Sequence, residues 1–155
     1  MNTQIHKFSS LTFPRIFRHP YLAAVCAFST ATASAASFTS GNLVVYRVGD
    51  GATSLVNTGN PVFIDEYTPS GTLVQSVAMP TTVSGANKRL IASGTASSEG
   101  LIARSGDGNY LLATGYDAPM PTTSLTGTAS TAVNRVVARI ANDGTVTPSA
   151  RASCN

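Results

Sequence analysis

The sequence has few of the residues on which most hydrolases and metalloenzymes depend. Its two histidines, His6 and His19, both lie in an N-terminal segment that we expect to be removed from the mature protein. A chain without histidine cannot hold a Ser-His-Asp triad or a histidine-based zinc site. The sequence also lacks a Gly-x-Ser-x-Gly elbow, a Gly-x-x-x-x-Gly-Lys phosphate loop and an Asn-x-Ser/Thr glycosylation acceptor. These absences exclude the commonest hydrolase, zinc-enzyme and nucleotide-binding classes.

The N-terminal segment has the order of features that is typical of an export signal. Three basic residues precede an apolar, small-residue run from Tyr21 to Ala36: Lys7, Arg15 and Arg18. Ala33-Ser34-Ala35 supplies the small residues that a signal peptidase requires, so residues 1–35 are predicted to be a signal peptide. The apolar stretch is too short to span a bilayer, which argues against a stable membrane anchor. We therefore expect a secreted protein, extracellular or periplasmic.

Removal of this segment changes the charge and the cysteine content. Of the ten basic residues three leave with the signal, so seven remain against seven acidic ones and the mature chain is formally neutral. The largest basic cluster that remains is Lys88-Arg89, which is too small for a nucleic-acid surface, and we predict no nucleic-acid partner. Cys26 leaves as well, so Cys154 is the only remaining thiol and no internal disulfide can form.

The mature sequence predicts an all-β fold. No window keeps apolar residues at three- and four-residue spacing, whereas Gly, Thr, Ser and Val are abundant throughout. The residues from Glu99 to Asp117 read as a β-hairpin around the glycine-rich turn Ser105–Asn109. The predicted strands are Asn42–Val48, Val62–Tyr67, Thr72–Met79, Leu90–Ser93, Gly100–Arg104, a strand that begins with the run Tyr110–Ala113, Arg135–Ala141 and Thr145–Thr147.

Two parts of the chain show a similar pattern, which indicates an internal repeat. The segment 41–50 aligns with 108–117 at an offset of about 67 residues, and 63–72 aligns with 136–145 at an offset of about 73. The sequence therefore predicts two units, at about 38–80 and about 90–150. The second unit reads as four strands, of which Arg135–Ala141 alternates between apolar and polar positions as a half-exposed strand should.

The segment Glu99-Gly-Leu-Ile-Ala-Arg-Ser-Gly-Asp-Gly-Asn-Tyr-Leu111 resembles the first-strand, Asp-Gly turn and second-strand signature of β-propeller repeats of the YVTN/WD-like kind. The region from Phe38 to about Ala150 is similar to uncharacterised secreted bacterial propeller proteins. The resemblance implies about two four-stranded antiparallel blades and export, but no activity. Because propellers close with about four to eight blades, we expect the 155 residues to be an incomplete fragment, with a small β-sandwich or a self-assembling half-propeller as the alternative.

Few side chains are candidates for chemistry. Glu99 and Asp117 would lie at the mouth of a propeller channel and are the candidate ligand-binding residues, for calcium or a sugar hydroxyl. Asp65 and Glu66 are adjacent, so on a strand they point to opposite faces and cannot act as an acid and base pair; one is expected to be solvated and the other hydrogen-bonded. Asp107, between two glycines, fits a β-turn. No catalytic residue, metal site or cofactor is predicted.

These observations favour a secreted, non-enzymatic module that binds a protein or a glycan. Two alternatives stay open: a fragment of an extracellular propeller enzyme that acts on saccharides or esters, and a structural cell-surface protein. Unpaired strand edges would also permit self-association.

Overall fold

The computed structural model describes residues 35–151 and confirms the all-β prediction. The described residues form eight strands and one short 3₁₀ helix, η1 (Leu125–Gly127). The strands are β1 (Leu43–Val48), β2 (Asn60–Tyr67), β3 (Leu73–Ala78), β4 (Ile91–Ala92), β5 (Ile102–Arg104), β6 (Tyr110–Asp117), β7 (Asn134–Ala141) and β8 (Val146–Arg151). Apart from Ala35, the predicted signal peptide lies outside the described residues, and so does Cys154.

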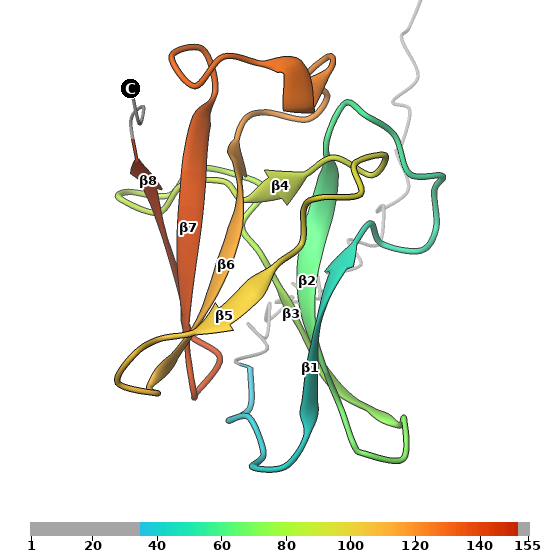
Figure 1. The fold of residues 1–155 in the computed structure, drawn as a ribbon, viewed down its shortest axis with the longest axis vertical. Helices are drawn as coiled ribbons and strands as arrows, with labels where there is room; N and C mark the ends of the chain where they lie inside the picture. Colours follow the sequence, from blue (N-terminus) through green and yellow to red (C-terminus); the bar gives the residue numbers. More distant parts are fainter. Residues whose placement is uncertain (1–34, 152–155) are drawn as a thin grey trace, which may run out of the picture. The chain divides into compact units, whose positions relative to one another are not determined.

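All strands pair antiparallel in one open sheet that contains two meanders. In the first meander β2 lies between β1 and β3, and in the second β6 and β7 lie between β5 and β8. Figure 1 shows the first meander on one side of the view and the second on the other, with β4 crossing between them. β4 pairs with the start of β2 (Pro61↔Ile91) and with the end of β6 (Ile91↔Tyr116). The hydrogen-bonded path therefore runs without a break from β1 to β8.

The two meanders share one apolar core. Alternate side chains of β2 and β3 gather with alternate side chains of β6 and β7, as strand periodicity requires when one face of each strand is buried. This cluster contains Val62, Ile64, Val77, Met79, Leu90, Ala92, Ala113, Val136, Ala138 and Ile140. A second cluster lies on the other face of β6, where Ile91, Tyr116, Ala118, Leu125 and Val133 pack together. The loop from Ala118 to Val133 thus covers part of that face.

Candidate functional site

Glu99 lies just before β5 and holds two segments together. Its Oε2 accepts a hydrogen bond of 3.0 Å from the backbone N–H of Ser93, and its Oε1 accepts one from the Tyr116 hydroxyl. Burial, together with this bond and the negative charge of Glu99, raises the pKa of Tyr116 to about 12. The guanidinium of Arg135 lies 4.5 Å from the centroid of the Tyr116 ring. Glu99, Tyr116 and Arg135 line a small cavity of about 200 Å³, together with Thr114, Gly115, Val136 and Val137.

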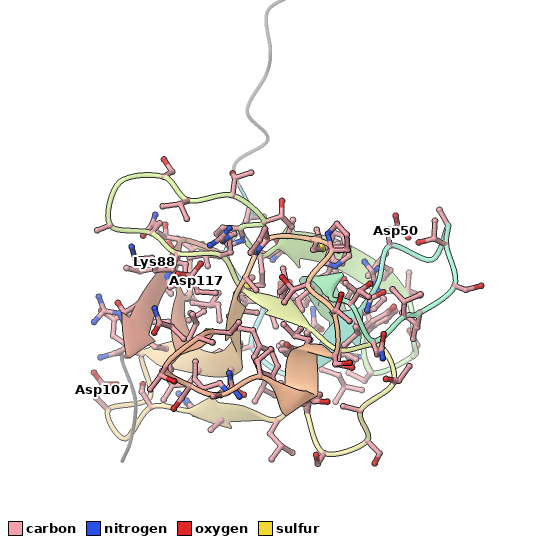
Figure 2. The ribbon with its side chains drawn as sticks, turned by 90° about the horizontal axis from the view of Figure 1, so that it is seen from above. Asp50, Lys88, Asp107 and Asp117 are labelled. Carbon is pink, nitrogen blue, oxygen red and sulfur yellow. The ribbon has the colours of Figure 1, made fainter. Side chains whose placement is uncertain are left out.

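Asp117 ends β6 and has a different partner. Its Oδ1 accepts a 2.8 Å hydrogen bond from Nε of Arg89, and the pair is an ion bridge in which the aspartate side chain is 9% exposed. Because successive strand residues point to opposite faces, Asp117 and its neighbour Tyr116, which holds Glu99, face opposite ways. The structure therefore gives Glu99 and Asp117 separate partners on different faces of β6. Figure 2 shows Asp117 near Lys88, at the end of the loop that leads into β4.

The prediction that one of Asp65 and Glu66 is solvated and the other hydrogen-bonded is wrong in one respect. Their side chains do point to opposite faces, but neither is solvated: Asp65 is 1% exposed and Glu66 is 0% exposed. Asp65 lies on the outer face of β2, where it accepts hydrogen bonds from Arg47 and Ser76. The sequence did not indicate this burial, because the side chains that cover Asp65 come from β1 and β3.

Glu66 lies at the end of the core-facing side of β2 and is surrounded by donors. It accepts hydrogen bonds from the N–H of Thr39 at 2.7 Å, from Nδ2 of Asn42 at 2.6 Å and from Nε2 of Gln75 at 2.7 Å. Desolvation raises the pKa of Glu66, but the bonds from Gln75, Thr39 and Asn42 outweigh it, so the net pKa is lowered. Glu66 is thus held ionised and joins the segment before β1 to β2 and β3.

Each of the seven Asp and Glu side chains of the chain accepts at least one hydrogen bond from the chain itself. Three of them, at Asp50, Asp107 and Asp143, accept backbone N–H groups two residues onward, which is the usual way in which aspartate closes a turn. Asp107 also accepts the Ser105 hydroxyl, and these bonds lower its pKa. The other four are those of Asp65, Glu66, Glu99 and Asp117. Among the described residues no group of three His, Cys, Asp or Glu side chains gathers as a metal site.

An open groove that the sequence did not reveal lies beside the core. This groove has a volume of about 440 Å³, within the usual range of about 300 to 1,000 Å³ for ligand sites. Its lining is partly apolar and partly polar: Phe38, Val44, Leu111, Ile140 and Ala141 are apolar or aliphatic, and Arg104, Asn109, Tyr110 and Asn142 bring polar groups, with Gly108 between them. Such a lining can take an apolar group that carries a polar or charged end.

The sequence does not reveal the groove because three stretches far apart in the chain line it, within residues 38–44, 104–111 and 140–142. Leu111 and Ile140 are direct partners in the β6–β7 ladder, and Phe38 is held nearby through the bond from its N–H to the carbonyl of Asn142. Val44 comes from β1, in the other meander. The one signal in the sequence is that Val44, Leu111 and Ile140 are apolar residues near strand ends, where a core can open to solvent.

Comparisons with protein-family models, with curated proteins and with solved structures gave no match to this chain. In the part of the chain that the structure describes, no helix is long and apolar enough to cross a membrane.

Proposed function

We propose that the protein is a secreted, non-enzymatic β module that binds a protein or glycan partner, with the groove beside the core as the binding site. The groove has the size of a ligand site and combines an apolar lining with the polar side chains of Arg104, Asn109 and Asn142. Export is supported by the sequence of residues 1–35, which has the charged, apolar and small-residue order of a signal peptide.

The proposal that the module is non-enzymatic is based on the observation that both candidate carboxylates, Glu99 and Asp117, are bound to other groups of the chain. A general acid or base needs a side chain that can exchange a proton with a substrate within hydrogen-bond reach. In this chain Glu99 is engaged by Ser93 and Tyr116, and Asp117 is engaged by Arg89. The rival proposal, a propeller enzyme that acts on saccharides or esters, needs these two carboxylates to converge, and their separate partners argue against it. The other alternative, a structural role at the cell surface, does not require a groove, so the groove favours the binding proposal.

The finer architecture is part of the same proposal. The two antiparallel meanders, β1 to β3 and β6 to β8, support the repeat and the propeller resemblance. The shared core and the pairing of β4 with both β2 and β6 favour the sandwich alternative, because propeller blades are separate sheets. Either arrangement gives a rigid scaffold with loops and edges available for binding.

The proposal is tested by measuring binding and turnover with the same ligands. The full chain is screened against a glycan array and a library of displayed peptides, and each ligand that binds is incubated with the protein and analysed by mass spectrometry. The expected result is saturable binding without any change in the mass of the ligand. Turnover of a saccharide or ester that Glu99→Gln abolishes, while the variant unfolds at the same temperature as the wild type, would overturn the proposal.

A further inference from the structure

We infer that the unpaired edge of β1 and the groove beside the core act together as a peptide site. An extended peptide would add to β1 as a new strand, place one large apolar side chain in the groove and set a carboxylate against Arg104. This inference rests on the proposed binding function and specifies the partner as a peptide and its mode as strand addition.

The edge of β1 offers backbone groups for such a strand. Among the described residues β1 pairs with β2 alone. The N–H of Gly49 donates to the carbonyl of Pro61, and alternate residues of an antiparallel strand bond to the same partner. Leu43, Val45 and Arg47 therefore direct their backbone groups to β2, while Val44 and Tyr46 direct theirs away from it. These two residues present donors and acceptors along the edge.

The other edges are less suited to pairing. β5 has only three residues, and β8 contains Pro148, which has no N–H and whose carbonyl accepts the N–H of Lys88 at 3.4 Å. β3 pairs with β2 through a register shift between Glu66 and Tyr67, so its edge is irregular. β1 has six residues, no proline and no break in its register with β2. It is therefore the edge that a peptide can extend most readily.

The groove lies where the side chains of an added strand could contact it. Neighbouring residues on paired strands share a face, and the side chain of Val44 lines the groove. A peptide residue opposite Val44 would thus point its side chain toward the same apolar surface, formed with Leu111 and Ile140. Leu43 is 57% exposed on the other face of the edge, where a second apolar contact is available.

Arg104 supplies the charge preference. Its Nε donates to the carbonyl of Gly108 at 3.0 Å, which fixes the guanidinium at the groove. Among the described residues the ion pairs are Arg47–Asp65 and Arg89–Asp117, and Arg104 belongs to neither. Asp107, in the same turn, is occupied by Ser105 and Asn109. A guanidinium without a carboxylate partner at the rim of an apolar groove matches a peptide that carries Asp, Glu or its own C-terminal carboxylate.

A second copy of β1 does not fit this site. The residues that share the groove-facing side of β1 are Val44, Tyr46 and Val48, and all three pack against the core of their own chain. Two copies joined edge to edge would leave the groove without an apolar side chain. The occupant is therefore a separate extended peptide.

The test begins with selection of short random peptides displayed on phage against the full chain. We expect the selected peptides to share an apolar residue near an acidic residue or the C-terminus. The strongest binder is then synthesised with single N-methyl groups along its backbone, and its affinity is measured by fluorescence anisotropy. Strand addition predicts that N-methylation weakens binding at alternate positions only, because alternate amides face β1. This readout uses the wild-type protein and does not depend on how a variant folds.

Protein variants supply matched controls. Val44→Pro removes an N–H that β2 does not use, and should weaken binding about five- to ten-fold. Ala78→Pro removes an equivalent outward N–H on β3, since its neighbour Met79 is the residue that bonds to Val62, and should leave binding within about two-fold. Arg104→Glu should shift the preference from acidic to basic peptides, whereas Lys88→Glu should not.

Three outcomes would overturn the inference: no peptide is enriched, N-methylation shows no alternation, or Ala78→Pro weakens binding as much as Val44→Pro. If the protein binds a peptide or glycan and Val44→Pro does not change the affinity, binding by strand addition is refuted, whereas the proposed binding function is not. Association of the protein with itself that Val44→Pro abolishes, without peptide enrichment, would replace the peptide by a second copy.

Discussion

The guanidinium of Arg47 covers the carboxylate of Asp65 on the outer face of β2. Nε of Arg47 lies 2.6 Å from Oδ2 of Asp65, and the guanidinium carbon lies 4.2 Å from the centroid of the Phe63 ring. The two side chains differ in exposure, at 35% for Arg47 and 2% for Asp65. The arginine can therefore reach water without its partner, whereas the aspartate cannot.

This asymmetry predicts unequal effects of the two single substitutions. Arg47→Ala leaves the buried carboxylate of Asp65 without its ion-pair partner, and the Ser76 hydroxyl is then its remaining side-chain donor. The substitution should lower the free energy of unfolding by about 3 kcal/mol. Asp65→Ala leaves an arginine that can turn to solvent, and should cost about 1 kcal/mol. Urea denaturation measures both. Equal losses, or a larger loss for Asp65→Ala, would contradict this account of the pair.

Glu66 is predicted to stabilise the fold only while it is ionised. Its lowered pKa means that its contribution is present above the ordinary glutamate value of about 4.3 and is lost as the pH falls through the native value. Glu66→Gln places an amide among three donors and should cost about 2 kcal/mol at neutral pH. The variant should also lose less stability on acidification than the wild type, as measured by urea denaturation across the acidic range. An unchanged acid profile would show that Glu66 does not contribute in this way.

Much of the strand pattern could be predicted from the sequence, and the errors have physical causes. Residues 135–141 alternate in burial, as expected from a strand with one face on the core. β2 begins earlier than predicted, at Asn60, because Asn60 and Pro61 pair with β4. β8 extends past the predicted end at Thr147 because Pro148 is tolerated on an edge strand. Local periodicity shows neither the pairing of β2 with β4, which lies far along the chain, nor the position of β8 at an edge of the sheet.

The candidate site was predictable only as a set of residues. Glu99 was identified as a functional candidate, but its bonds to Ser93 and Tyr116 depend on how β4, β5 and β6 lie together. The groove depends on the approach of Val44 to Leu111 across the core. Side-chain partners of this kind follow from tertiary packing, which composition and spacing do not determine.

Gly115 is predicted to be required by the close approach of β4 to β6. A Cβ atom at this position would lie 2.8 Å from the carbonyl oxygen of Ile91 and 2.8 Å from Cγ of Leu90. Gly115→Ala should therefore lower the free energy of unfolding by about 2 kcal/mol, because the backbone has to shift. Gly106→Ala, at a turn glycine with nothing within 4 Å of the added carbon, is the matched control and should change stability little. Thermal unfolding of both variants measures the difference, and equal melting temperatures would contradict the prediction.

The Tyr116 hydroxyl should make the fold sensitive to alkaline pH. Burial and the bond to Glu99 raise the pKa of Tyr116 from 10.0 to about 12, and burial also raises the pKa of Tyr46. Between these two pH values the unfolded chain releases a tyrosine proton that the native chain retains, so the free energy of unfolding falls as the pH rises through this window. Below about pH 10 the contribution of Tyr116 is fully present.

Tyr116→Phe separates this effect from the other tyrosines. The variant loses the hydroxyl that Glu99 accepts and should lose about 1 kcal/mol at neutral pH. Its stability should then decline less steeply than that of the wild type between about pH 10 and pH 12, because one of the two tyrosines with a raised pKa is absent. Denaturant unfolding at a series of alkaline pH values measures these slopes, and a parallel decline in Tyr116→Phe and the wild type would show that the Glu99–Tyr116 bond does not link stability to pH.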